Sequence, residues 1–242
     1  MKLMWWLLAA GAAAAQTIPK QVRGVKPCPG LKAAHVYQEG GRPAVQVQVL
    51  MHVDVDGAPN AYGPRGKKAL DTEAHAHAPK ESGNPNEIVG YMTEYPGGPP
   101  TVQGKRDPMP GYYVSQTDFF DKSIKREEDP RRYVDASKIN YVVQGRVAKQ
   151  NGVKLGDFAT VYSCRTGQSA FAIVADSGNE SGAEGSLALV QALGYNIKDG
   201  VEDSVDKAEI VVTYYPKTNP DRQFFHTQAE LDAAAAKLGI LK

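Results

Sequence analysis

The chain has 242 residues and carries 28 Lys and Arg against 27 Asp and Glu, which gives a formal net charge of +1. This balance excludes the global positive field of a general binder of nucleic acids or anionic membranes. Hydrophobic residues make up 42% of the chain, which excludes a disordered protein and is enough to fill a sizeable core. The 24 Gly, 16 Pro and 12 Tyr favour a fold rich in turns and strands.

The first 15 residues read MKLMWWLLAAGAAAA, with a basic start, an apolar middle and a run of small residues. This order is typical of a secretory signal peptide that is cleaved after Ala15. The alternative is a buried N-terminal helix, and the run is too short to span a bilayer. We therefore expect a protein secreted to the extracellular space or the periplasm, formally neutral once Lys2 is removed and without membrane association.

The chain has two cysteines, Cys28 and Cys164, too few for a disulfide scaffold or a four-cysteine zinc site. Outside the cytoplasm such a pair favours one disulfide, which would tie the arm that follows the signal to the middle of the chain. The alternative, a catalytic thiol, has no nucleophile motif around Cys164 to support it. We predict the disulfide.

Residues 16–43 are rich in Pro and Lys and lack a clear periodicity, so we interpret them as an N-terminal arm before one domain at 44–242. The domain begins with alternating apolar and polar residues, which are typical of a half-buried strand. This strand is expected to end at the turn signal Asp56-Gly57. Many Gly, Pro and Asn predict a long loop region at 58–111, and such loops are often functional. The expected strands are 44–55, 88–92, 111–115, 141–144, a hairpin of 157–162 with 170–175, and 209–214.

Two helices are indicated by capping signals. Ser181 and Glu184 fit a capping box, and apolar residues follow at helical spacing up to Leu193. Thr227 and Glu230 fit a second capping box before an Ala-rich C-terminal helix. Because strands and helices do not alternate regularly, we predict a mainly β (α+β) fold: a single β-barrel-like domain with two helices, with a double-psi topology as a hypothesis.

The main candidates for catalysis lie between residues 170 and 194. A predicted strand ends at Asp176, and Glu184 follows before the predicted helix. Two carboxylates that share a cleft but have different surroundings can act as acid and base in glycoside hydrolysis. Each residue also has a structural alternative, because Glu184 could cap the helix and Asp176 could form an Asx-turn. Glu180 is a further carboxylate on the same loop.

A second acidic patch starts at Asp54 and Asp56. Its pattern is similar to the start of a calcium loop, but Arg65 stands where an EF-hand requires Glu, so that site is excluded. The remaining interpretations are a turn or an acidic wall that holds a cationic sugar. His75 and His77 could bind a metal, yet no third ligand follows at a convincing spacing. We therefore predict neither a metal site nor a cofactor.

Five segments together resemble the glycoside hydrolase family 75 chitosanases. The family's enzymes are secreted endo-hydrolases that cut β-1,4 links of chitosan with inversion. Their essential pair is an Asp at the end of a strand and a Glu in a Gly-Glu-Gly-Ser-like stretch, which by resemblance fall on Asp176 and Glu184; Ala183 here replaces the first Gly. The segments, in the family's order, are DVDGAPNAY (54–62), YYVSQTDF (112–119), RRYVDASKINYVV (131–143), GDFATV (156–161) and FAIVADSGNESGAEGSLAL (171–189).

This resemblance implies a two-carboxylate mechanism without a cofactor. Because a helix N-terminus favours an ionised carboxylate, we hypothesise that Glu184 activates water and Asp176 donates the proton. We also hypothesise acidic residues that face the ammonium groups of glucosamine and tyrosines that stack on sugars; turn-formers and core aromatics are the alternatives. The acidic residues are Asp54, Asp56 and Asp157, and the tyrosines are Tyr62, Tyr112 and Tyr113.

Two other functions stay open beside the chitosanase. A peptidoglycan lytic transglycosylase would need one catalytic Asp on a small barrel, so Asp176 alone would serve. A non-catalytic carbohydrate-binding or envelope protein would bind sugar without releasing reducing ends. In each case we expect a monomer whose partner is a polysaccharide and not a nucleic acid. Because the mature chain is formally neutral, attraction to chitosan requires a locally acidic cleft.

Overall fold

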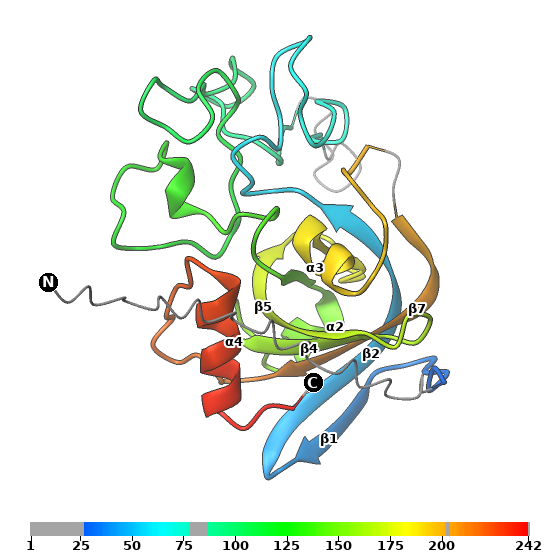
Figure 1. Ribbon diagram of the computed structural model, residues 1–242. Helices are drawn as coiled ribbons and strands as arrows, with labels where there is room; N and C mark the ends of the chain where they lie inside the picture. The colour runs from blue at the N-terminus through cyan, green and yellow to red at the C-terminus, as the bar shows by residue number, and fades with distance from the viewer. Residues whose placement is uncertain (1–26, 78–86, 202–203, 242) are drawn as a thin grey trace, which may run out of the picture.

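The computed structural model describes residues 27–77, 87–201 and 204–241 (Figure 1); the predicted signal peptide at 1–15 lies outside them. The helices and strands, in chain order, are β1 (His35–Glu39), β2 (Arg42–Asp54), the 3-10 helix η1 (Pro130–Arg132), β3 (Tyr141–Gln144), α2 (Arg146–Gln150), β4 (Phe158–Ser163), β5 (Ser169–Ser177), β6 (Glu184–Ser186), α3 (Leu187–Ala192), β7 (Ser204–Tyr215) and α4 (Gln228–Lys237).

Six strands form a closed barrel in the order β2-β6-β3-β5-β4-β7, since β7 also pairs with β2. β1 adds to this barrel through an antiparallel pairing with β2. The pairs β2–β6 and β3–β5 are parallel and the others are antiparallel, so the chain does not run simply up and down. The predicted single, mainly β barrel domain is thus confirmed, while the double-psi topology stays a prediction.

β2 organises the barrel because it is the longest strand. Its alternating sequence pairs with β1 and β7 along the first part and with β6 and β7 further on, and the register shifts between Val49 and Met51. The strand ends in the predicted turn at Gly57, which has a φ of +78°. A Cβ there would lie 2.1 Å from the Val134 carbonyl oxygen, so only glycine fits this approach. The turn starts the loop region that carries much of the cleft described below.

Two hydrophobic clusters occupy opposite faces of the sheet. Along β5, Ile173 and Ala175 belong to one cluster, while Ala172 and Val174 belong to the other, as alternation in a strand requires. Helices α2 and α3 pack into the second cluster and α4 packs into the first. Figure 1 shows the strands curving around α3, with α4 standing beside β4 and β5.

The helix after residue 181 begins later than the predicted capping box. Glu184 lies in the extended strand β6 and pairs with His52 of β2, and the N-cap is Ser186, whose side chain accepts a hydrogen bond from the Leu189 N–H. The prediction of Ser181 and Glu184 as a capping box is therefore wrong. The physical reason is that pairing with β2 holds this stretch extended, which a local capping signal cannot overcome.

The other strand and helix predictions are confirmed in part. The runs at 141–144 and 209–214 and the hairpin are confirmed, as is the capping box of Thr227 and Glu230 on α4. The predicted strands at 88–92 and 111–115 form only isolated bridges. Each pairs with another segment at single residues, because the neighbouring Gly and Pro residues interrupt a continuous ladder. The arm contains the five-residue strand β1, and the five-residue helix α2 follows β3. Neither element was predicted from the sequence.

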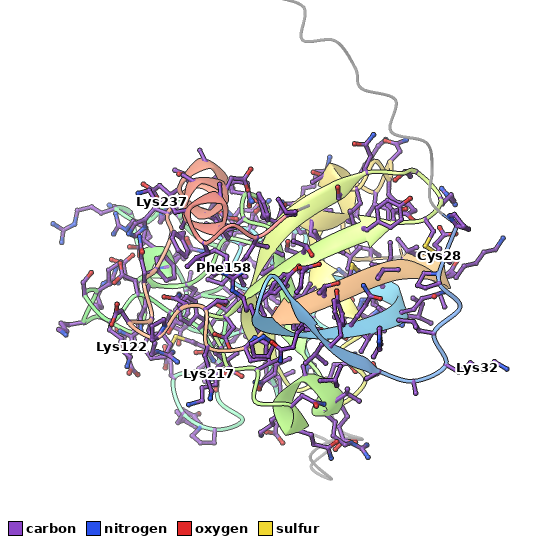
Figure 2. All side chains as sticks on the ribbon, turned by 90° about the horizontal axis from the view of Figure 1, so that it is seen from below. Cys28, Lys32, Lys122, Phe158, Lys217 and Lys237 are labelled. Atoms are coloured by element: carbon purple, nitrogen blue, oxygen red, sulfur yellow. A yellow bond between two sulfur atoms is a disulfide. The ribbon has the colours of Figure 1, made fainter. Side chains whose placement is uncertain are left out.

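The predicted disulfide is confirmed between Cys28 and Cys164. It joins the arm to the connection between β4 and β5, and Figure 2 labels Cys28 beside these strands. None of the helices in the described ranges is long and apolar enough to cross a membrane.

Candidate active site

A cleft of about 1520 Å³ opens between the loops that follow β2 and the ends of β2, β5 and β6. Among its described lining residues, nine carry a carboxylate and Arg132 is the one Lys or Arg. The loop segment that forms one side of this cleft runs from cyan to green in Figure 1. The nine acidic residues are Asp54, Asp56, Asp71, Glu87, Asp118, Glu127, Asp176, Glu180 and Glu184.

Three of these residues form one group, the acidic cluster of Asp54, Asp56 and Asp176. Each offers a carboxylate oxygen, and these oxygens lie within 4.8 Å of one another. Asp54 ends β2, Asp56 lies in the turn after it, and Asp176 lies near the end of β5. The closed barrel therefore brings together side chains that are more than a hundred positions apart in the chain.

Hydrogen bonds hold Asp56 in this position. Its carboxylate oxygen Oδ1 accepts from the Tyr62 hydroxyl at 2.9 Å and from Ser115 Oγ at 3.3 Å. Its N–H donates to Asp54 Oδ1 at 2.8 Å, and its carbonyl oxygen accepts from the Tyr141 hydroxyl at 3.0 Å. Tyr62 is 4% exposed and Tyr141 is fully buried, so the network is anchored in the core.

The surroundings raise the pKa of each member of the acidic cluster. Desolvation and the charge of Glu184 raise the pKa of Asp54 to about 7. Desolvation and the charge of Asp54 raise the pKa of Asp56 and of Asp176 well above the ordinary value for a carboxyl. Like charges this close cannot all ionise, so the cluster retains protons near neutral pH.

Asp176 is 8% exposed and its carboxylate is oriented by backbone donors. Oδ1 accepts from the N–H groups of Ser177 at 2.7 Å and Asp118 at 3.4 Å. The segment that contains Asp118 lies beside β5, because the Phe119 N–H donates to the Ala175 carbonyl oxygen at 2.8 Å. These contacts leave Asp176 at the border between the core and the cleft.

Glu184 approaches the cleft from β6 and is partly exposed. β3 lies between β5 and β6 in the sheet, so Asp176 and Glu184 belong to strands two positions apart. Neighbouring strands are spaced by about 4.8 Å, which puts these two backbones about 10 Å apart. Since Glu184 does not cap a helix, the helix-dipole argument for its ionisation does not apply.

The structure places the other predicted substrate residues differently. Tyr62 lines the cleft but is buried, and Tyr113 is buried outside the lining. Tyr112 lies under the Lys67 ammonium at 4.8 Å and is also outside the lining. Asp157 is buried, where it accepts hydrogen bonds from the backbone of Lys154 and Thr218. A structural role accounts for Asp157 and for these three tyrosines.

Sequence reasoning did not single out three cleft residues, Asp118, Phe120 and Glu127. Asp118 stands inside the segment YYVSQTDF, so the family resemblance could have indicated it. Phe120 directly follows that segment, and nothing in its local pattern distinguishes it from a core aromatic. Glu127 belongs to a charged run that is typical of a solvated surface. Asp118, Phe120 and Glu127 share no sequence pattern, and the folded structure alone brings them to the same cleft.

The cleft also contains residues that could hold a metal. The acidic cluster has the spacing of a carboxylate site for a divalent cation. Shared protons and the hydrogen bonds to Tyr62, Ser115 and Ser177 explain the close approach of these oxygens equally well. His75 is oriented by Asp71, whose Oδ1 lies 2.7 Å from Nδ1, and His77 forms a bridge with Ile88.

A scan against protein-family models finds no match, and a search of curated proteins finds none either.

Replacing Asp54 with Asn should flatten the dependence of stability on pH. With a folded-state pKa of about 7 against an ordinary 3.8, the folded protein binds more protons between these values, so stability falls as pH rises from about 4 to 7. The shift corresponds to roughly 3 kcal/mol after allowance for solvent screening. Urea unfolding from pH 4 to pH 8 measures this slope, which should be smaller in Asp54→Asn.

The exposed Asp221 supplies the matched control, because Asp221→Asn makes the same change outside the cleft. It should leave the slope as in the parent protein. An unchanged slope in Asp54→Asn would contradict the raised pKa of Asp54.

Proposed function

We propose that the protein is a secreted, monomeric, endo-acting glycoside hydrolase that cleaves β-1,4 linkages of chitosan or a related aminoglycan with inversion. The observation that carries this proposal is the cleft around Asp176 and Glu184, with nine carboxylates against one guanidinium. The acidic cluster retains protons near neutral pH, but six further carboxylates line the cleft. A cleft dominated by negative charge concentrates cationic ligands, here the ammonium groups of a glucosamine polymer. The open groove also suits attack within a chain.

In this mechanism Asp176 is the general acid. Its burial and the neighbouring charge of Asp54 favour the protonated form, which a leaving glycosidic oxygen requires. The N–H groups of Ser177 and Asp118 hold one carboxylate oxygen, so the rotation of the group is restricted. Asp54 and Asp56 act as neighbours that keep the proton on the cluster.

Glu184 is the general base that activates a water molecule. It is more exposed than Asp176, and this favours an ionised carboxylate. Inverting enzymes need about 6.5–9.5 Å between their two carboxyl groups to admit that water. Two backbones about 10 Å apart, with side chains that face one cleft, are compatible with this range.

The cleft charge argues against the second candidate, a peptidoglycan lytic transglycosylase. Peptidoglycan carries carboxylates on its peptide stems, and a lining of carboxylates repels them. The third candidate, a non-catalytic binding protein, has no use for a buried carboxyl that stays protonated beside its ligand. A chitosan hydrolase accounts for both the acidic lining of the cleft and the protonated, buried carboxyl of Asp176.

Incubation of the purified protein with chitosan, chitin and peptidoglycan tests the proposal. We expect new reducing ends from chitosan, and NMR of the first products should show the α-anomer, because inversion converts the β link. Glu184→Gln should lower the rate by at least about 10²-fold, since a general base contributes that much or more.

Glu94→Gln is the matched control, because Glu94 is exposed and lies outside the cleft lining. It should retain the activity of the parent protein. Full activity in Glu184→Gln would refute the role of Glu184 and favour a mechanism with one Asp.

A further inference from the structure

A glucosamine polymer has apolar C–H faces as well as ammonium groups, so a cleft that binds it needs an accessible aromatic surface. The described lining residues include three aromatics, Tyr62, Phe120 and Tyr133. Tyr62 and Tyr133 are buried, and their hydroxyls are used in hydrogen bonds within the protein. Phe120 is partly exposed, and it alone among them can offer its ring to a ligand.

Phe120 lies close to the proposed general acid. The segment Asp118 to Phe120 runs beside the end of β5, where Phe119 is hydrogen-bonded to Ala175 and buried in the core. Asp118 and Phe120, two residues apart, line the cleft, as alternation of an extended chain predicts. Two residues span about 7 Å, so Phe120 stands roughly one sugar away from the Asp118 N–H that contacts Asp176.

The ring of Phe120 stacks with Arg132, which also lines the cleft. The guanidinium carbon lies 4.0 Å from the ring centroid. Arg132 is itself buried and held, because one Nη donates to the Ile124 carbonyl oxygen. Its Nε makes no hydrogen bond to any described residue, which suits a group that faces the π electrons of a ring. The guanidinium thus covers one face of the ring, and the part of the ring that stays exposed lines the cleft.

Glu127 supplies a carboxylate next to this ring. Its Oε1 lies 3.7 Å from Nη2 of Arg132, and its side chain is 69% exposed. The Glu127 carbonyl oxygen also accepts from the Tyr133 hydroxyl at 2.8 Å, which fixes the local backbone. The carboxylate offsets the guanidinium charge beside the ring, so a cation that approaches the exposed part of the ring meets less repulsion.

We propose that Phe120 forms a sugar-stacking subsite next to Asp176 and that Glu127 selects a deacetylated sugar at that subsite. The C–H face of the glucosamine ring packs on Phe120, and its ammonium group pairs with the Glu127 carboxylate. An N-acetyl group removes that ion pair. This inference rests on the proposed function, because it assigns one binding position on the same substrate.

Binding to the full chain with Asp176→Asn, which prevents turnover, tests the subsite. Titration calorimetry with a β-1,4-linked glucosamine hexamer should show about tenfold weaker binding after Phe120→Leu, which keeps apolar volume but removes the flat ring. Phe120→Trp should retain the affinity of the parent. Tyr95→Leu is the control, because Tyr95 is an exposed aromatic outside the cleft lining.

Glu127→Gln tests the selectivity separately. The ratio of affinities for the glucosamine hexamer and the N-acetylglucosamine hexamer should fall severalfold, with thermal unfolding unchanged. If the parent binds the hexamer and Phe120→Leu binds equally well, the subsite is refuted and the proposed function stands. If the parent does not bind the hexamer and the wild-type protein does not cleave chitosan, both the proposed function and the subsite are refuted.

Discussion

Replacing Asp176 with Asn should lower chitosan hydrolysis by about 10³-fold, within the range that general acid catalysis contributes. The Asn amide cannot donate the proton that the leaving oxygen needs. The substitution replaces a carboxyl that stays protonated near neutral pH with a neutral amide of similar shape, so the melting temperature at that pH should be nearly unchanged. Initial rates of reducing-end release and thermal unfolding of the same preparations measure both effects.

The pH profile of the wild-type protein provides a further check on this prediction. The raised pKa of Asp176 keeps the acid protonated far above pH 3.8, so the alkaline limb of kcat/KM should lie well above the ordinary carboxyl range. Asp221→Asn, outside the cleft, is the matched control and should keep the wild-type rate. Activity in Asp176→Asn within tenfold of the wild type would contradict the assignment of the acid.

Removing the disulfide should destabilise the folded protein by about 5 kcal/mol in the loop-entropy account, because the closed loop is long. Cys28 and Cys164 are separated by 136 positions, and the unfolded chain gains the freedom of that whole segment. Urea unfolding of the Cys28→Ser/Cys164→Ser variant, compared with the oxidised parent, measures the difference.

The location of the disulfide separates its effect on stability from any effect on chemistry. Cys28 and Cys164 do not line the cleft, so the folded variant should hydrolyse chitosan at the parent rate under mild conditions. Reduction of the parent by dithiothreitol should reproduce the loss of stability. A loss below about 1 kcal/mol would show that the arm adds little constraint to the unfolded chain.

Much of the barrel could be predicted from local patterns. Alternation gave the body of β2, the hairpin of β4 and β5 and most of β7, because a strand with one buried face repeats every two residues. The short strand β6 could not be found this way. Glu184 to Ser186 is too short to show a period, and only pairing with β2 keeps it extended and delays α3.

The candidate site shows the same division. Asp176 and Glu184 could be proposed from residue type and family resemblance, and Asp54 and Asp56 from an acidic turn. The sequence placed Asp54 and Asp56 only on a hypothesised acidic wall. Their position beside Asp176 depends on the closure of the barrel, which brings the three carboxylates together. Phe120 had no signal, since its exposure depends on its neighbours in space.

The sequence by itself determined most of β2, β3, β4, β5 and β7, the capping of the last helix, the cysteine pair and the carboxylates worth testing. These depend on local periodicity, short-range hydrogen bonds and residue type. The tertiary structure decided that the barrel closes, that Tyr62, Tyr113 and Asp157 are buried, and that the cleft concentrates negative charge in a chain with a net charge of +1. Burial and pKa depend on groups far apart in the chain, so only the folded arrangement could decide them.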